Sequence, residues 1–155
     1  MERFIELYET VYKDLYYLAL YYLGNPHDAE DAVSEAVMHA YEHFSSLKSE
    51  DAFRSWMIKI LVNQCKLQQK KRVKNKTEEI TEELSYHPKL DDRLITKDML
   101  QILSDEERMI LVLSIFGGYK GEEIAACLNL LHSTVRSKYR RALKKLEKQV
   151  LAWEV

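Results

Sequence analysis

Apolar residues recur along this chain at steps of three and four positions, which is the spacing of one face of an α-helix. The first such face lies between residues 4 and 23 and consists of Phe4, Tyr8, Val11, Leu15, Leu18 and Tyr22, widened by Ile5, Tyr12, Ala19 and Leu23. A second face is rich in small residues and consists of Ala29, Val33, Ala36, Val37, Ala40 and Phe44. A third consists of Phe53, Trp56, Met57, Ile60, Leu61 and Leu67 and leads into the basic run KLQQKKRVKNK. Three amphipathic helices are therefore predicted in the first half of the chain.

Short sequence signals mark where helices end and begin. Gly24 suits the left-handed residue after a helix, Asn25 can cap the next helix, and Pro26 fits its first turn. The SDEE sequence at 104–107 has the spacing of a capping box. An apolar stretch of Leu90, Leu94, Ile95, Leu100 and Leu103 precedes that box, and the GG pair at 117–118 ends the apolar helix after it.

A compact helix-turn-helix pattern occupies residues 121–146. Its first helix is predicted to bury Ile124, Ala125 and Leu128. Asn129 stands where the turn needs a left-handed residue, which Asn tolerates better than most. We expect Ser133 or Thr134 to cap the second helix, whose core side is predicted to be Val135, Tyr139, Ala142, Leu143 and Leu146.

The other side of this second helix is basic. Seven Lys and Arg residues lie between 134 and 149, against the single acid Glu147. Arg can bridge the O6 and N7 atoms of guanine, while Ser and Lys can bind phosphates or base edges. A basic helix is more often only a solvated surface, but the near absence of acids favours DNA contact. The candidate residues are Ser133, Arg136, Ser137, Lys138, Arg140, Arg141 and Lys144.

Composition agrees with an all-α protein. The 155 residues fit one medium domain or two small ones, and 4 Gly and 2 Pro leave few turns for a many-stranded fold. The sequence shows no signal peptide and no apolar run long enough to cross a membrane. Cys65 and Cys127 are far apart and are interpreted as reduced thiols. We therefore expect a cytoplasmic protein without membrane insertion, and the sequence indicates no cofactor.

The net charge of −2 is at odds with a DNA-binding protein until its distribution is considered. Residues 76–95 hold 3 basic and 6 acidic residues, whereas residues 96–155 hold 10 basic and 8 acidic ones. The acidity is thus concentrated in a predicted linker. A chain with this balance should bind duplex DNA weakly by itself, and joining two weak modules on one platform would strengthen binding.

A zinc-protease pattern is also present in the sequence. HAYEH at 39–43 satisfies H-x-x-E-H, in which two His one turn apart hold a metal beside a general base. Catalytic zinc needs a third ligand, and no downstream residue stands in a matching context. We interpret the motif as surface, predict no metal site and no enzymatic activity, and find no other catalytic motif.

Three segments resemble one known family in their order along the chain. LGNPHDAEDAVSEAVMHAY is similar to a DAED-containing region 2 helix, and FRSWMIKILVNQCKLQQKKR to the W-x-x-x-I-x-x-N segment with its basic tail. LSDEERMILVLSIFGGYKGEEIAACLNLLHSTVRSKYRRALKKL is similar to a region 4 pattern that ends in T-V-x-S-x-x-x-R-A. Over essentially its full length, the chain resembles the extracytoplasmic-function (ECF) class of bacterial RNA polymerase sigma factors.

The resemblance implies an all-α protein of two small domains joined by an acidic linker. Residues 1–75 would form a region 2-like domain that binds core RNA polymerase and the −10 element of promoter DNA, and 76–93 the linker. Residues 94–155 would form a region 4-like domain that reads the −35 element through its helix-turn-helix. An anti-sigma factor that holds the protein inactive is also implied.

The resemblance also assigns roles to single residues. The basic-helix candidates become −35 readers, with Lys138, Lys144 and the neighbouring Lys145 better suited to phosphates. The −10 contacts would come from Asn63, Lys66, Lys70 and Lys71, although Asn63 has an equally good interpretation as a polar residue satisfied within its helix. Asp31 and Glu35, one turn apart, would face the polymerase.

The chain departs from the family pattern at three places. Asn129 replaces the usual Gly of the turn, Gly121 replaces a Ser or Thr, and Leu67 replaces an Asp or Asn expected to help with the −10 element. Two other functions stay open on the residues alone. One is an autonomous helix-turn-helix regulator that binds a palindromic duplex without polymerase, and the other is a helical protein whose basic helix binds an acidic partner.

Overall fold

The computed structural model describes residues 1–74 and 96–153, and within these ranges the regular structure is helical. The elements are α1 (Glu2–Leu23), α2 (Pro26–Glu42), the 3-10 turns η1 (Phe44–Ser46) and η2 (Glu50–Ala52), α3 (Phe53–Lys74), α4 (Lys97–Leu100), α5 (Asp105–Ile115), α6 (Gly121–Leu128) and α7 (His132–Trp153). The predicted all-α class is confirmed. The predicted linker at 76–93 lies outside the described residues, and so do Leu94 and Ile95 at the predicted start of the second domain.

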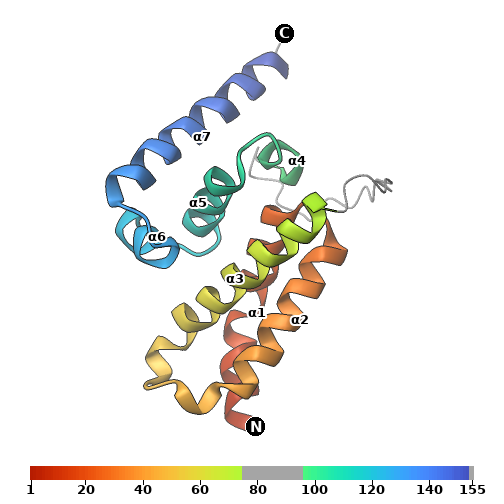
Figure 1. The fold of residues 1–155 in the computed structure, drawn as a ribbon, viewed down its shortest axis with the longest axis vertical. Coiled ribbons are helices and arrows are strands. Elements are labelled where there is room, and N and C mark those ends of the chain that lie inside the picture. Colours follow the sequence, from red (N-terminus) through yellow and green to blue (C-terminus); the bar gives the residue numbers. More distant parts are fainter. Residues whose placement is uncertain (75–95, 154–155) are drawn as a thin grey trace.

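The helices form two groups, α1–α3 and α4–α7 (Figure 1). Helices contact one another mostly within each group, and the buried apolar side chains of the two groups form one continuous cluster. We call α1–α3 the first domain and α4–α7 the second domain. In the first domain, fully buried Ala29, Ala36 and Ala40 leave room for α2 to lie close to its neighbours. An aromatic cluster closes the end near the N-terminus, where the Phe4 ring meets the Phe44 and Phe53 rings edge to face at 5.3 and 5.8 Å between centroids.

The predicted helix boundaries are confirmed where a local signal sets them. Gly24 has φ 86°, and the Asn25 side chain accepts a hydrogen bond from the Asp28 N–H at 2.8 Å. The capping box before α5 is complete, because the Ser104 and Glu107 side chains each accept from the other residue's N–H at 3.2 and 2.9 Å. α5 ends at Ile115, just before the glycine pair.

The predicted core faces are wider than the real ones. Ile5, Tyr12, Leu67 and Leu143 were assigned to core faces, but 46, 46, 52 and 41% of their surfaces are exposed. A helix in a small bundle is covered only over the arc that faces its neighbours, so residues at the edge of a broad stripe reach solvent. The Trp56 side chain, also assigned to a core face, is only partly buried and packs against the edge of the core.

The prediction that Ser133 or Thr134 caps α7 is wrong. α7 begins at His132, and the Val135 N–H already donates to the Leu131 carbonyl at 3.1 Å. Ser133 and Thr134 therefore lie inside the first turn rather than before it. The neighbouring His132 ring fills the space beside Gly121, where a Cβ would come within 2.8 Å of its Nε2 atom.

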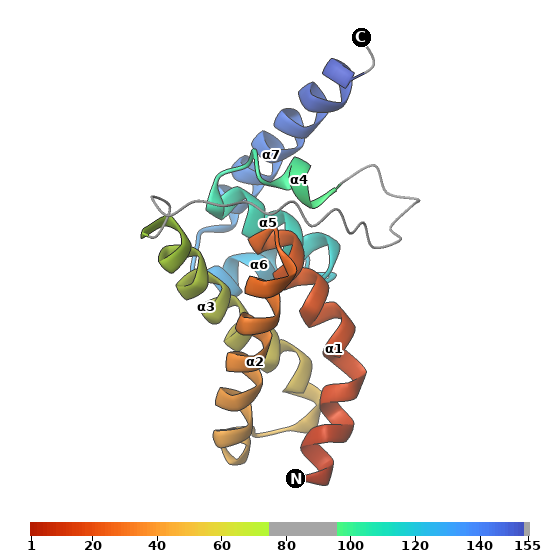
Figure 2. The same ribbon diagram turned by 90° about the vertical axis from the view of Figure 1, so that its right-hand side faces the viewer.

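The two domains pack against each other through the end of α1. This helix contacts both α4 and α5, and the second domain sits over its C-terminal end (Figure 2). The N-terminus lies at the far end of the first domain from α7 (Figure 1). Among the described helices, none combines the length and the apolar character that a membrane crossing needs.

Candidate nucleic-acid interface

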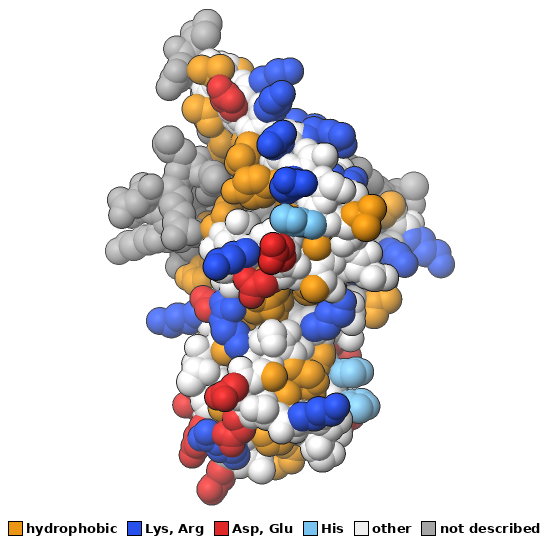
Figure 3. All heavy atoms as spheres, turned by 90° about the vertical axis from the view of Figure 1, so that its left-hand side faces the viewer, with side chains coloured by type: hydrophobic (Ala, Val, Ile, Leu, Met, Phe, Trp, Pro, Cys, Tyr) orange, Lys and Arg blue, Asp and Glu red, His pale blue; other side chains and the backbone are white. Residues whose placement is uncertain are grey.

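The outer face of α7 carries the predicted DNA-binding side chains in one exposed row. Figure 3 shows Lys and Arg side chains gathered over this helix in the upper part of the molecule. Six of the seven candidates are exposed: Ser133, Arg136, Ser137, Arg140, Arg141 and Lys144. The opposite face is buried through Val135, Ala142 and Leu146. The fold therefore presents these groups to solvent together.

The turn before α7 fixes the direction of that row. Asn129 has φ 57° and ψ 47°, the left-handed conformation predicted for it. The Leu130 N–H then donates to the Ala125 carbonyl at 2.9 Å, which closes the end of α6. Buried Ile124 and Leu128 hold α6 against the core. A short helix, a tight turn and a longer helix with an exposed basic side make a helix-turn-helix.

Two lysines of α7 are engaged with α5 instead of pointing freely outward. Lys138 pairs with Glu106 at 2.9 Å, and Lys145 pairs with Glu107 at 2.7 Å. Burial would raise the pKa of the Glu107 carboxyl, but hydrogen bonds from Lys145 and Ser104 outweigh burial, and its pKa is lowered. Lys138 is therefore the candidate least available to DNA.

The second candidate surface lies on α3. Asn63, Lys66, Lys70 and Lys71 are all exposed and share one broad side of this helix, at 100° per residue. Leu67 lies in the middle of that side and is half exposed. This surface thus combines cations and a polar amide with one apolar side chain.

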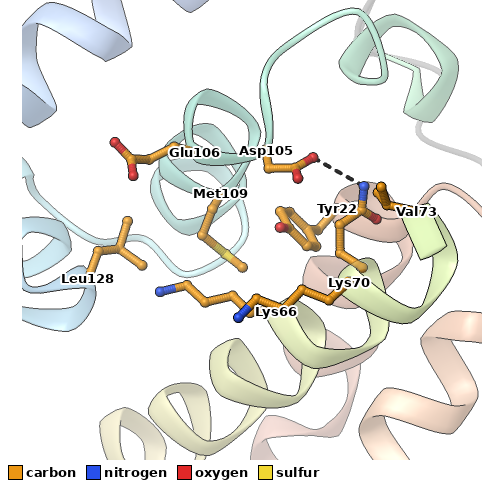
Figure 4. Close-up of a pocket in the computed structure, with 9 residues that line it drawn as sticks. Tyr22, Lys66, Lys70, Val73, Asp105, Glu106, Met109 and Leu128 are labelled. Atoms are coloured by element: carbon orange, nitrogen blue, oxygen red, sulfur yellow. Dashed lines mark hydrogen bonds between the residues drawn. The ribbon is translucent and has the colours of Figure 1, made fainter.

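The surface on α3 borders a cavity of about 430 Å³ between the domains. Lys66 and Lys70 extend along its α3 side, and Asp105 and Glu106 approach from α5 (Figure 4). The Gln69 side chain spans the gap, because its Nε2 donates to the Asp105 carboxylate at 3.1 Å. The structure therefore brings part of the α3 surface opposite carboxylates of the second domain.

On α2, Asp31 and Glu35 are exposed and lie one turn apart. They lie on a different helix from the α3 and α7 candidates. In the H-x-x-E-H motif, the His39 and His43 rings stack at 4.4 Å, and His43 Nδ1 lies 2.9 Å from the His39 carbonyl oxygen. The described residues hold no cluster of three or more His, Cys, Asp or Glu placed to bind a metal.

Both cysteines are free thiols. Cys65 is fully buried, and burial raises the pKa of its thiol. Cys127 is partly buried at the boundary between the domains. Burial raises the pKa of this thiol too, against the nearby charges of Lys59 and Lys66.

Sequence reasoning missed a buried cation that joins the domains. Arg108 of α5 is only 2% exposed, and its Nε donates to the Tyr22 carbonyl at 2.6 Å. One signal was present in the sequence: Arg108 is the single cation of α5 and directly precedes the apolar run from Met109 to Leu113, and a buried guanidinium needs several acceptors. Which acceptors it would find depends on how the domains pack, and no local pattern reports that.

A helix-turn-helix with an exposed basic face, next to a separate three-helix domain with its own basic surface, defines a two-domain nucleic-acid-binding protein. The family model for sigma-70 region 2 matches residues 7–74, and that for sigma-70 region 4 matches residues 93–146. The chain is 29% identical over 143 residues to the RNA polymerase sigma factor SigV of Bacillus subtilis, covering 89% of this chain and 85% of that protein. It is 27% identical over 135 residues to the RNA polymerase sigma-E factor of Streptomyces coelicolor, covering 83% and 75%.

Solved structures share the fold. The sigma factor RpoE of Bartonella quintana, in complex with the anti-sigma factor NepR, superposes with a TM-score of 0.82 at 24% identity over 97% of this chain and 98% of that one. CnrH, in complex with the cytosolic domain of CnrY, superposes with a TM-score of 0.72 at 21% identity over 98% and 90%. This chain belongs to the ECF family of sigma factors, which are not enzymes but bind core RNA polymerase and promoter DNA to start transcription.

Proposed function

We propose that the first domain binds core polymerase and the −10 element while the second domain reads the −35 element. In this division, residues 1–75 and 94–155 act as separate modules joined by residues 76–93. The observation that supports it best is the exposed basic row of α7, which follows the left-handed turn at Asn129. Arg136, Ser137, Arg140 and Arg141 are the proposed base readers, and Ser133 and Lys144 the proposed phosphate contacts.

Run-off transcription with purified core polymerase tests this proposal. The unmodified chain should give a promoter-dependent product. Arg136→Ala and Arg140→Ala should each lower its yield about 5- to 150-fold at limiting protein, because a bidentate contact to a base contributes about 1–3 kcal/mol. Lys148→Ala is the matched control, since Lys148 is also an exposed cation of α7 but is not among the proposed contacts.

Two results would favour a different function. Unchanged transcription after charge reversal at both Arg136 and Arg140 would mean that the basic helix binds a protein partner. Tight binding of a palindromic duplex at physiological salt without polymerase would mean an autonomous regulator.

On α3, we propose that Asn63, Lys66, Lys70 and Lys71 hold the unpaired strand of the −10 element. Exposed amides and ammonium groups suit this role, because an unpaired strand offers base edges and phosphates together. Asn63→Ala combined with Lys71→Ala should reduce permanganate reactivity of thymines in the open complex while duplex binding by the holoenzyme persists. Lys13→Ala on the exposed side of α1 should leave that reactivity unchanged.

On α2, we propose that Asp31 and Glu35 meet the polymerase. Charge reversal at both positions should weaken binding of the chain to core polymerase at least tenfold, because two like-charged contacts then replace two attractive ones. Glu30→Lys, one position away on the same helix and equally exposed, is the matched control. If the unmodified chain, the double variant and Glu30→Lys bound core polymerase equally well, Asp31 and Glu35 would not be part of the polymerase interface.

We also propose that the protein works in the cytoplasm, where core polymerase works, and that an anti-sigma factor holds it inactive. Support for the inhibitor comes from the solved likeness to a sigma factor bound by the anti-sigma factor NepR. Co-purification of the tagged chain from its own cells, followed by run-off transcription with and without the captured protein, tests it. A captured protein that fails to suppress transcription is not the inhibitor.

A further inference from the structure

The cavity beside α3 combines apolar side chains with charged groups (Figure 4). Its volume is about 430 Å³, and small-molecule sites usually have volumes of about 300–1,000 Å³. Buried Tyr22, Met109 and Leu128 contribute apolar surface to the cavity, one each from α1, α5 and α6. An aromatic or aliphatic group that enters the cavity therefore exchanges contact with water for contact with apolar atoms, which is favourable.

The charged groups beside this cavity include two cations without partners. Lys66 and Lys70 extend along its α3 side, and neither forms a hydrogen bond or an ion pair with another of the described residues. The carboxylates opposite are already paired, because Asp105 accepts from Arg108 at 2.8 Å and Glu106 accepts from a lysine of α7 at 2.9 Å. The two lysines thus keep their positive charge without a counter-charge, and they favour an anionic group in the cavity.

A buried oxygen of Gln69 adds a hydrogen-bond acceptor to the same lining. Gln69 Nε2 donates to the Asp105 carboxylate at 3.1 Å, which sets the orientation of the amide. The amide oxygen Oε1 is buried and has no hydrogen-bond partner among the described residues. Buried polar atoms in folded proteins are nearly always hydrogen-bonded. This oxygen is therefore suited to accept from an N–H or O–H group of a ligand.

We propose that this cavity binds a small amphipathic anion, a molecule with an aromatic or aliphatic body, one acidic group and one hydrogen-bond donor. The body lies against Met109 and Leu128, and the acidic group lies beside Lys66 and Lys70. The donor group binds Gln69 Oε1. A free phosphate ion lacks the apolar body and a hydrocarbon lacks the charge, so neither matches the whole lining. The proposed site is separate from the promoter contacts and does not depend on them.

Fluorescence of 8-anilinonaphthalene-1-sulfonate tests the site in the full chain. This probe carries aromatic rings, a sulfonate and an N–H donor, and it should bind at a single saturable site. Its uncharged analogue N-phenyl-1-naphthylamine should bind about tenfold more weakly, because the hydrogen bonds between the lysines and the sulfonate are lost. Equal affinity for the two probes would overturn the proposal. So would displacement of the sulfonate probe by an equal concentration of inorganic phosphate.

Methionine methyl signals in the nuclear magnetic resonance spectrum show where the probe binds. With isotope-labelled methionine methyl groups, a saturating amount of the probe should shift the signal of Met109, which Met109→Leu identifies. Met1 and Met38 are 76 and 59% exposed, lie outside the cavity and serve as internal controls. An unchanged Met109 signal at saturation would place the probe elsewhere and overturn the proposal.

Variants of the two lysines test the anionic part of the site. Lys66→Ala combined with Lys70→Ala should weaken binding of the sulfonate probe about tenfold or more, since hydrogen bonds to a charged group are lost. Lys13→Ala combined with Lys148→Ala changes the net charge equally at exposed positions that do not line the cavity, and it should leave binding unchanged. Equal weakening by both pairs would mean general attraction to a basic surface and overturn the proposal.

A variant of Gln69 tests the acceptor. Gln69→Met keeps the length of the side chain without its amide and should weaken binding about 2- to 12-fold, as expected for the loss of one hydrogen bond. Circular dichroism shows whether each variant keeps its helix content. None of these measurements uses polymerase or promoter DNA, so their outcome is independent of the proposed function.

Discussion

At the scale of single residues, Asn129 shows how one backbone conformation supports the recognition helix. Its φ of 57° is the only positive value among the non-glycine residues of the described ranges. L-residues with a Cβ are strained there by about 1–2 kcal/mol, and Asn less than most because its side chain can hydrogen-bond locally. The turn between α6 and α7 is therefore built on a residue that nearly matches the flexibility of glycine.

Substitutions at Asn129 should separate this backbone effect from any DNA contact. Asn129→Ala should lower the free energy of unfolding by about 1 kcal/mol, whereas Asn129→Gly should keep or slightly raise it, since glycine has no penalty at positive φ. Urea denaturation followed by circular dichroism gives both values. If the Gly variant lost as much stability as the Ala variant, the side-chain amide rather than the backbone would hold the turn.

At the scale of elements, α5 joins the core to the recognition helix through Glu107. This buried carboxylate accepts the Ser104 N–H at 2.9 Å and the Lys145 ammonium at 2.7 Å. One side chain thereby completes a helix N-terminus and ties α7 to α5.

Glu107→Gln should lower the free energy of unfolding by about 2 kcal/mol at pH 7, because hydrogen bonds to a charged group contribute about 1.5–3 kcal/mol. The pKa of Glu107 is lowered in the folded protein. Its contribution is therefore fully present above the unfolded-state pKa of about 4.3 and is lost as the pH falls through the lower folded pKa. Urea denaturation at pH 7 and at pH 3 should show the difference between the two proteins shrinking in acid.

The exposed neighbour Glu106 provides the control for this pH dependence. Glu106→Gln breaks an ion pair at the surface, where such pairs contribute about 0–1 kcal/mol. If Glu106→Gln lowered the free energy of unfolding as much as Glu107→Gln does, burial would not explain the contribution of Glu107 to stability.

Helices were predictable from the sequence because their signals are local. The glycine after α1, the Asn25 cap and the capping box before α5 each act within a few residues, and all three were confirmed. The start of α7 was predicted wrongly because the residue before His132 is Leu131, whose side chain has no hydrogen-bond acceptor, so the sequence holds no capping residue at that position. The partner of Arg108 lies 86 positions away along the chain. Contacts of that kind depend on how the domains pack, and hydrophobic periodicity does not contain that information.

The candidate site was predictable to a similar degree. The spacing of α7 placed six exposed polar or basic residues on one face, because exposure there follows from helix geometry alone. The pairing of Lys138 with Glu106 was missed, since it depends on α7 lying across α5. The DNA and polymerase roles of these side chains stay predictions for the experiments above.

At the scale of the whole molecule, the net charge of −2 sets how the protein can meet DNA. Lys138 and Lys145 are already paired with carboxylates within the second domain. These two lysines are therefore less available to neutralise phosphates, and phosphate neutralisation dominates non-specific affinity.

The isolated chain should therefore bind duplex promoter DNA no more tightly than about 1–100 μM at physiological salt, the range of non-specific binding. Fluorescence anisotropy of a labelled promoter fragment measures this, and adding core polymerase should raise the affinity by about 10² to 10⁴ through linked binding. Nanomolar binding by the chain alone would contradict the charge argument. A scrambled fragment of equal length controls for sequence preference.

The position of the two sulfur atoms has a practical consequence. Cys65 is buried within the first domain, whereas Cys127 is partly buried where the domains meet. The Lys59 ammonium donates a hydrogen bond to the backbone carbonyl of Cys127. A maleimide dye added to the unmodified protein should therefore react only with Cys127, and slowly while the two domains stay in contact. The rate of this alkylation would report how often the domains separate, without any engineered label.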